Sequence, residues 1–270
     1  MKRRVYSGES ARPASRKHRV SLCTTCMGRL ADLSRTLPTN IELNRDYGNV
    51  EFVVLDYNSS DGLEDWMRSE MRQHIESGLV SYYRTDEPQF YSMTHSRNLA
   101  FKVASGEIVC NVDADNLTLN VDLPQQQRPK ASFAETLNLL ANQCPERAFF
   151  AKGRQLMRGR LGFFKWEFIH LLGGYDEQLV GYGHDDHDLR NRAWALGFTM
   201  VRFSRDHMWR FKTGGAKKNE NMQHPSWKAT ETRNKALSEQ NLAAGRYQAN
   251  VGKHWGKARL IKNFTQEIEV

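Results

Sequence analysis

Buried strands alternate with helices along residues 20–115, and this alternation constrains the fold more than any other feature of the chain. Three short apolar runs, Val20–Thr25, Glu51–Asp56 and Leu79–Arg84, have the composition of buried strands, and helical segments connect them. Short connections between such elements favour a mainly parallel sheet with helices on both faces. The sequence therefore predicts an α/β fold whose ligands bind beyond the carboxyl ends of the strands.

Two carboxylates follow the fourth predicted strand. Asp113 and Asp115 stand one residue apart after the run Gly106–Val112, and a helix with Arg97 and Asn98 precedes that run. Side chains alternate along a strand, so both carboxylates leave it on the same side. Two such oxygen ligands suit Mg²⁺ or Mn²⁺, which in turn holds a diphosphate. The alternative is a surface turn, where Asp and Asn are ordinary residues.

A second acidic cluster lies within Gly181–Arg192. The apolar spacing of Leu189, Ala193 and Leu196 predicts a helix that begins near Asp185. Its first turn is rich in Asp and His, whereas helix capping and dipole compensation require only one or two acids. We therefore expect a site here rather than a cap alone, and the neighbouring glycines supply hinges for a closing loop.

Charge divides the chain into three parts. Residues 1–19 carry seven Lys or Arg against one Glu, and residues 210–270 carry twelve against five, while the whole chain has a net charge of +8. We expect a disordered basic tail at 1–19, a catalytic domain at 20–209 with a mobile loop at 117–130, and a basic extension at 210–270. Two interpretations of the basic ends stay open: contact with an anionic surface, or a solvated tail and a charged helix face.

Neither secretion nor a membrane span is expected from the composition. Hydrophobic residues make up 39% of the chain, and no run approaches the ~20 apolar residues of a transmembrane helix. The basic N-terminus lacks the apolar stretch of a signal peptide. The four cysteines have neither disulfide-framework nor zinc-ribbon spacing. We therefore expect reduced thiols and a cytoplasmic protein, at most peripherally bound to a membrane.

The order of these motifs resembles the glycosyltransferases of the GT-A fold, the nucleotide-diphospho-sugar transferase type. Residues 20–115 resemble the family 2 of inverting transferases, with Ser-Arg-Asn-Leu-Ala before Asp-Ala-Asp. The stretch Gly-Tyr-Gly-His-Asp-Asp at 181–186 is similar to a C-terminal motif of β-1,4-galactosyltransferases and polypeptide N-acetylgalactosaminyltransferases. The resemblance implies a nucleotide-sugar-binding half at 20–116 and an acceptor-binding half at 131–209.

On the donor side, the resemblance implies that Thr25 and Asp56 line the base and ribose pocket. Arg97 and Asn98 would approach the nucleotide or its diphosphate. Family 2 members usually have two consecutive Asp after the second strand, and here the second is Tyr57.

For the metal, the resemblance implies that Asp115 is a ligand and that Asp113 takes part while facing the ribose. His207 lies where related enzymes place a histidine that completes the metal site, although a lone histidine near a strand end is as often structural. The implied cofactor is Mn²⁺ or Mg²⁺.

On the acceptor side, the resemblance implies that Asp185 holds the acceptor hydroxyl and that Asp186 is the general base. Asp185 stands where the family has Glu, one methylene longer. Tyr182, which the resemblance assigns to donor binding, stands for a Trp that packs on sugar in the galactosyltransferases, and a phenol ring stacks similarly.

The implied reaction is an inverting, metal-dependent transfer of a hexose or N-acetylhexosamine from a UDP-sugar to an acceptor hydroxyl. Glycan, lipid-linked sugar, protein and modified nucleic acid all stay open as acceptors. One alternative is a nucleotidyltransferase that makes the activated sugar, but Cys26–Arg29 poorly matches the Gly-rich phosphate loop of that class. A non-catalytic nucleic-acid-binding module is another, and salt-dependent DNA retention without sugar-nucleotide hydrolysis would favour it.

Overall fold

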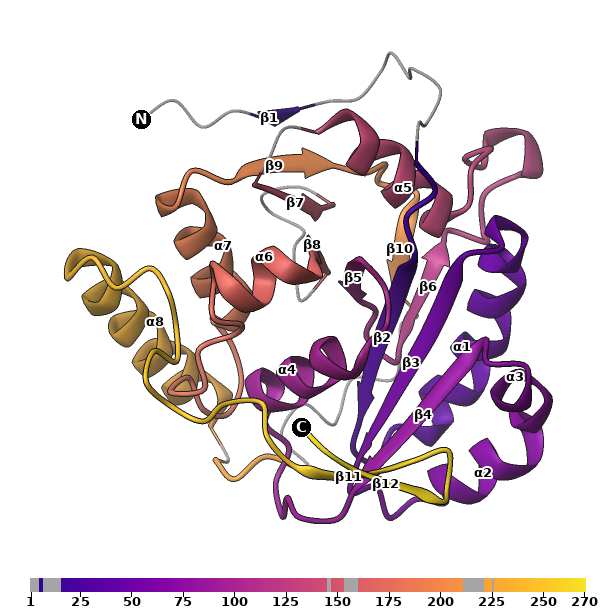
Figure 1. Ribbon diagram of the computed structural model, residues 1–270, viewed down its shortest axis with the longest axis horizontal. Helices are drawn as coiled ribbons and strands as arrows, with labels where there is room; N and C mark the ends of the chain where they lie inside the picture. Colours follow the sequence, from indigo (N-terminus) through magenta and orange to yellow (C-terminus); the bar gives the residue numbers. More distant parts are fainter. Residues whose placement is uncertain (1–4, 7–15, 145–146, 153–159, 211–220, 225) are drawn as a thin grey trace.

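The computed structural model describes most of the chain (Figure 1). The described residues are 5–6, 16–144, 147–152, 160–210, 221–224 and 226–270. Most of the predicted basic tail at 1–19 lies outside them, as do residues 211–220 at the start of the predicted extension. No helix in the described ranges combines the length and the apolar character that a membrane crossing requires.

A large mixed sheet organises the described part of the chain. Its strands lie in the order β1-β9-β7-β8-β5-β2-β3-β4-β11-β12, and the four neighbours β5, β2, β3 and β4 run parallel. This confirms the predicted α/β architecture with a mainly parallel centre. The strands are β1 (Val5–Tyr6), β2 (Val20–Cys26), β3 (Val50–Tyr57), β4 (Val80–Thr85), β5 (Ile108–Asn111), β7 (Ala148–Ala151), β8 (Leu161–Phe164), β9 (Thr199–Arg202), β11 (Arg259–Lys262) and β12 (Gln266–Glu269).

Helices cover both faces of the sheet (Figure 1). One apolar core lies between the sheet and α1, α2, α3 and α5, and a second lies between the sheet and α4, α6 and α7. Neighbouring residues Leu22 and Cys23 of β2 enter opposite cores, and the central strands β2 and β3 are buried along their whole length. The helices are α1 (Leu30–Asn44), α2 (Leu63–Glu70), α3 (Arg72–Glu76), α4 (Met93–Val103), α5 (Phe133–Gln143), α6 (Lys165–His170), α7 (Asp185–Ala195) and α8 (Trp227–Ala243).

A two-stranded ribbon stands beside the main sheet. It joins β6 (Asn116–Leu119) to β10 (His207–Arg210) in antiparallel register, with Arg210 opposite Asn116. The prediction of a loop over all of 117–130 was wrong at its start, because the pairing with a strand some 90 residues later is invisible in the local composition. The ribbon places Arg210 directly beside the turn that carries the first acidic pair.

The residues after 226 are packed into the same structure. Helix α8 lies beside α7 (Figure 1), and β11 pairs antiparallel with β4 at the edge of the main sheet. Leu260 of β11 is fully buried in the second core. This part of the predicted basic extension therefore contributes both a strand and a helix to the domain that it follows.

Candidate active site

The carboxyl ends of β2 and β5 open into a cavity of about 430 Å³. Its walls come from both halves of the chain: Thr25 near the end of β2, Asp113 and Asp115 after β5, and Asp185 and Asp186 at the start of α7. This is the edge at which parallel sheets bind their ligands. The two acidic clusters that the sequence singles out therefore share one cavity.

The first acidic pair lies in the turn that follows β5. Nδ2 of Asn111 donates a 2.8 Å hydrogen bond to Asp113, and the guanidinium of Arg97 lies 3.3 Å from the same oxygen. Asp115 accepts a 2.7 Å hydrogen bond from Nε of Arg210. Burial, followed by the charge of Asp113, raises the pKa of Asp115, and Arg210 opposes that rise. Each carboxylate is thus already neutralised by an arginine.

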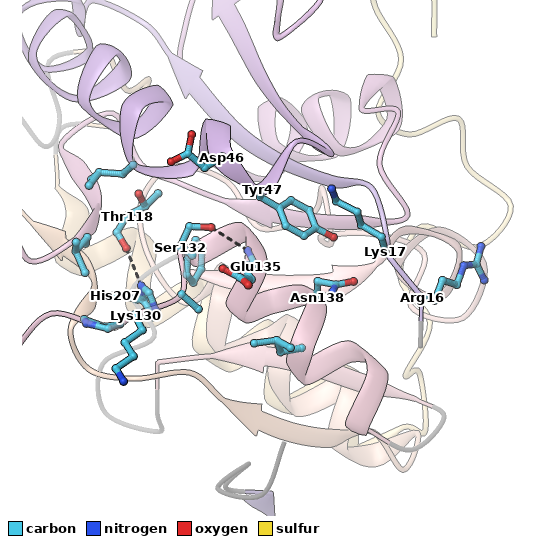
Figure 2. Close-up of a pocket in the computed structure, with 16 residues that line it drawn as sticks. Arg16, Lys17, Asp46, Tyr47, Thr118, Lys130, Ser132, Glu135, Asn138 and His207 are labelled. Atoms are coloured by element: carbon cyan, nitrogen blue, oxygen red, sulfur yellow. Dashed lines mark hydrogen bonds between the residues drawn. The ribbon is translucent and has the colours of Figure 1, made fainter. Parts of the chain in front are cut away.

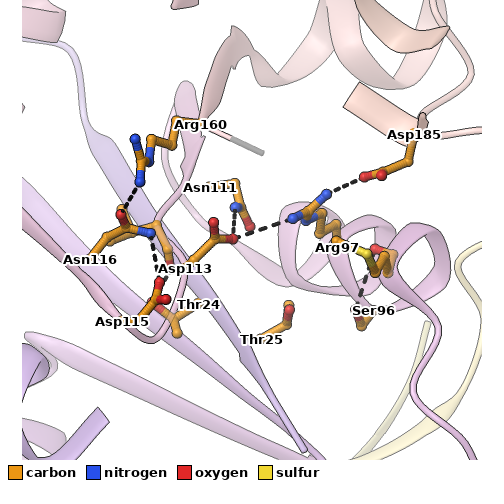
Figure 3. Close-up of polar contacts among 12 residues, drawn as sticks. Thr24, Thr25, Ser96, Arg97, Asn111, Asp113, Asp115, Asn116, Arg160 and Asp185 are labelled. Carbon is orange, nitrogen blue, oxygen red and sulfur yellow. Dashed lines mark hydrogen bonds and ion pairs between the residues drawn. The ribbon is translucent and has the colours of Figure 1, made fainter. Parts of the chain in front are cut away.

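Arg97 connects the two acidic clusters (Figure 3). It extends from α4, forms an ion pair with Asp185 and a second one with Asp113, and its side chain is only 3% exposed. Burial lowers the pKa of a guanidinium, but the charges of Asp185 and Asp113 outweigh it and hold the pKa of Arg97 well above its ordinary value. A charged group therefore lies between the clusters, and its burial is sustained by two counter-charges.

The three aspartates that open α7 have different surroundings. Asp185 is 5% exposed, and burial raises its pKa to about 6 against the opposing charge of its arginine partner. Asp186 lies on the cavity wall, with Oδ1 3.5 Å from Nδ1 of His187. Asp188 is fully buried in an ion pair with Nε of Arg192 at 2.7 Å. Two of the acids therefore belong to the cavity, whereas the third belongs to the core.

Two aromatic side chains form the cavity wall near Asp185 and Asp186. Tyr182 packs edge to face with Trp227, with ring centroids 6.4 Å apart. Burial raises the pKa of the Tyr182 phenol, which therefore stays neutral at physiological pH. Sequence reasoning found Tyr182 through its motif but missed Trp227, because that residue begins a helix in the segment that we set apart as an extension.

Arginines that sequence reasoning missed also line the cavity: Arg29, Arg160 and Arg210. Arg160 is 6% exposed and donates a 2.7 Å hydrogen bond to Asn116, whose Nδ2 donates to Asp115 (Figure 3). Guanidinium groups bind phosphate oxygens well. Each of these residues is a single base without a surrounding motif, so no local signal distinguishes it from a surface arginine.

Two residues predicted to bind the donor are not brought to the cavity. Asp56 is fully buried at the end of β3, where it accepts 2.7 Å hydrogen bonds from Tyr82 and Arg84. Asn98 is also fully buried, and its amide bonds both the backbone N–H and the carbonyl of Tyr175. These contacts fasten neighbouring segments together. We therefore leave both residues out of the site proposed below.

His207, predicted as a third metal ligand, lies in a different cavity of about 550 Å³ (Figure 2). Its Nδ1 lies 3.0 Å from the carbonyl of Thr118, and its Nε2 lies 3.1 Å from the hydroxyl of Thr136. Burial lowers its pKa, which keeps the ring neutral. Residues three apart on a strand face opposite ways, so the strand that presents Arg210 to Asp115 turns His207 to the other side. The structure does not bring it to the acidic pair.

Comparison with known proteins gives two family matches in succession along the chain. Residues 21–131 match the model of glycosyl transferase family 2, and residues 149–214 match the model described as the N-terminal domain of galactosyltransferase. A search of curated proteins gave no significant match. The two matched segments carry the first and the second acidic cluster, respectively.

Several solved glycosyltransferases have a similar fold. A mannosyltransferase from Pyrobaculum calidifontis, solved with GDP-Man and Mn²⁺, is 21% identical with a TM-score of 0.58, over 77% of this chain and 61% of that one. S. aureus TarS 1-349 with UDP-GlcNAc is 15% identical with a TM-score of 0.59, over 83% and 67%. GalNAc-T7 with UDP, GalNAc and Mn²⁺ is 14% identical with a TM-score of 0.52, over 78% and 47%.

The chain thus spans about three fifths of the first of these proteins and less than half of the last. At such identities the likeness concerns the fold. The chain has the fold of the GT-A glycosyltransferases, with a segment that matches the family 2 model followed by a segment that matches the galactosyltransferase model.

Proposed function

We propose that this protein moves a hexose or N-acetylhexosamine from a UDP-sugar to an acceptor hydroxyl, with inversion and with the help of a divalent cation. One observation carries the proposal: a single cavity holds the Asp113 and Asp115 pair of the family 2 segment and the Asp185 and Asp186 pair of the galactosyltransferase-like segment. The complexes of GalNAc-T7 and TarS with UDP or UDP-GlcNAc support the choice of a UDP donor.

The donor set of the cavity fits a cation such as Mn²⁺ or Mg²⁺. Asp113 and Asp115 offer oxygen ligands on one wall, and these cations usually take one or two carboxylates and complete their shell with water and substrate phosphates. Such a cation would neutralise charge that develops on the leaving diphosphate. Arg210, which pairs with Asp115 in the structure, would then be available to phosphate oxygens, whereas Arg97 keeps its ion pair with Asp185.

Asp186 is the general base in this proposal. A carboxylate at the start of α7 is favoured in its ionised form by the helix dipole, and an ionised carboxylate only accepts protons. It removes the proton of the acceptor hydroxyl while the new bond to the anomeric carbon forms and the bond to the diphosphate breaks. Asp185, already paired with Arg97, orients that hydroxyl. One displacement of this kind inverts the anomeric centre.

Release of UDP from UDP-sugars, with and without acceptor, tests the proposal. Asp186→Asn is expected to keep donor binding and to lose about 10²–10⁴-fold in transfer rate, because the amide cannot take the proton. Asp65→Asn is the matched control, since Asp65 also lies in the first turn of a helix but is exposed. Equal rates for the two variants would place the base elsewhere, and undiminished transfer after chelation would exclude the cation.

The two alternatives have less support. The family matches cover the segments that carry both acidic clusters, and both models describe transferases of sugars rather than nucleotidyltransferases or binding modules. A nucleotidyltransferase would release diphosphate from UTP and a sugar phosphate. That activity in place of sugar transfer would overturn the proposal.

A further inference from the structure

Helix α8 packs against the candidate acceptor side of the cavity through polar side chains. Thr230, Asn234 and Ser238 follow one another at intervals of four residues and so share one face of the helix. All three are buried, with exposed fractions of 6%, 1% and 0%. A helix that covers a domain normally buries an apolar stripe. The buried face of α8 is instead a row of hydrogen-bonding groups, which we call the polar seam.

The polar seam binds the loop that carries the acceptor-side residues. The hydroxyl of Thr230 donates to the carbonyl of Tyr182 at 2.9 Å and accepts from its N–H at 3.3 Å. Nδ2 of Asn234 donates to the carbonyls of Val180 and Gly183 at 3.0 and 2.9 Å. Four backbone groups, two of Tyr182 and one each of Val180 and Gly183, are thus held by two side chains of one helix.

The same seam reaches the core of α7. The hydroxyl of Ser238 donates a 2.7 Å hydrogen bond to Asp188, the buried partner of Arg192. The close approach of the loop to α8 also depends on glycine: Gly181 has φ +69°, and a Cβ there would lie 2.8 Å from Cγ2 of Thr230. The loop before α7 and the helix α8 are therefore in close contact from Gly181 to the first turn of α7.

The first residue of α8 completes the wall of the cavity. Trp227 is partly buried and packs edge to face against Tyr182. Three carboxylates, those of Asp185, Asp186 and Glu231, line the same cavity as this aromatic pair. Aromatic rings pack against the apolar face of a sugar ring, and carboxylates accept hydrogen bonds from its hydroxyls. Of these carboxylates, Asp185 is paired with Arg97, so Asp186 and Glu231 are the ones that would repel a phosphodiester backbone.

We propose that Trp227 is a specificity-determining residue, which with Tyr182 binds the ring of a neutral acceptor sugar, and that the polar seam of α8 positions both. The proposal rests on the glycosyl transfer proposed above and names the class of acceptor: a glycan with an uncharged terminal ring rather than a nucleic acid. Trp227 lies beyond both segments that match family models, which are residues 21–131 and 149–214.

Ligand-observed NMR with methyl glycosides of glucose, galactose, mannose and N-acetylglucosamine tests the binding step, because it needs no turnover. The wild-type chain is expected to bind at least one of them in the presence of UDP and Mn²⁺. Trp227→Ala is expected to weaken that binding about tenfold or more, and Trp227→Phe to keep most of it, since a ring remains. Binding of UDP is expected to be unchanged in both variants.

Kinetics separate the positioning role of the seam from a purely structural one. Asn234→Ala is expected to lower kcat for transfer and to leave UDP binding and donor hydrolysis near the wild-type values. Ser238→Ala, a smaller change in the same seam, is expected to act in the same direction. Lys235→Ala is the control, because Lys235 is the exposed neighbour of Asn234 and is 61% exposed.

Three results would overturn the inference: equal glycoside binding by the wild type and by Trp227→Ala, binding of none of the glycosides by the wild type, or transfer to oligonucleotides instead of glycosides. Failure of the proposed function has a different signature, namely the absence of UDP release from every UDP-sugar while glycosides still bind in a Trp227-dependent manner.

Discussion

Replacing Arg97 by Met removes the cation that lies between Asp113 and Asp185 while keeping most of the side-chain volume. The pair of Arg97 and Asp185 is buried at both partners, with side chains 3% and 6% exposed, so the small energies of surface ion pairs do not apply. Loss of one partner of a buried pair costs about 3–5 kcal/mol. We expect a destabilisation of that order at pH 8.

The destabilisation is expected to depend on pH. Burial raises the pKa of Asp185 from 3.8 to about 6. A carboxyl whose folded pKa is raised binds its proton more tightly in the folded state, so its contribution to stability falls as pH rises from about 4 through 6. In the wild type, the contribution of Asp185 to the free energy of unfolding falls by roughly 3 kcal/mol over this range. Without Arg97 the pKa of Asp185 rises further, so the deficit of the variant is expected to shrink on going from pH 8 to pH 5.

Urea unfolding of wild type and variant at both pH values measures this effect. The double variant Arg97→Met with Asp185→Asn is expected to recover much of the lost stability, because no uncompensated carboxylate remains at that position. Arg68→Met, which removes an exposed i,i+4 pair with Glu64, is the control and should cost less than about 1 kcal/mol. A deficit that is independent of pH, or equal in the single and double variants, would refute the reasoning.

Three further outcomes are expected. Asp188→Asn, which leaves Arg192 buried beside a neutral partner, should lower the free energy of unfolding by roughly 3 kcal/mol, as measured by urea titration. Gly181→Ala should lower the thermal midpoint and kcat together, because a Cβ at φ +69° carries about 1–2 kcal/mol of backbone strain and meets Thr230. His207→Asn should lower thermal stability yet leave Mn²⁺ affinity in the presence of UDP unchanged by calorimetry; a loss of Mn²⁺ affinity would restore His207 as a ligand.

The central fold was predictable because its strands are buried on both faces. Six of the eight residues of Val50–Tyr57 are apolar or aromatic and the whole strand is buried, and this composition is a local signal. The two acidic pairs were recognisable from the elements beside them. The first pair follows a buried strand, and the second begins a helix that the spacing of its apolar residues predicts. The structure places both pairs in one cavity.

The partners of individual side chains were not predictable. Asn98 and Arg97 are neighbours in one motif, yet one bonds the backbone of Tyr175 and the other bridges two acids, because the helix turns them toward different segments. Helix α8 gave no usable signal either. Its buried face consists of Thr, Asn and Ser, so its sequence lacks the apolar periodicity that indicates a packed helix.

The hairpin β11–β12 has a consequence for the behaviour of the chain in solution. It pairs with β4 at Tyr83 and Arg84, while Asn263 bonds the backbone N–H and carbonyl of Tyr82. Without this hairpin, β4 would present a row of unpaired backbone groups beside Tyr82, and such an edge promotes edge-to-edge aggregation. The strand that now lies outermost, β12, is short, carries two glutamates and is largely exposed. Like charges there discourage the pairing of this edge with the same edge of a second chain.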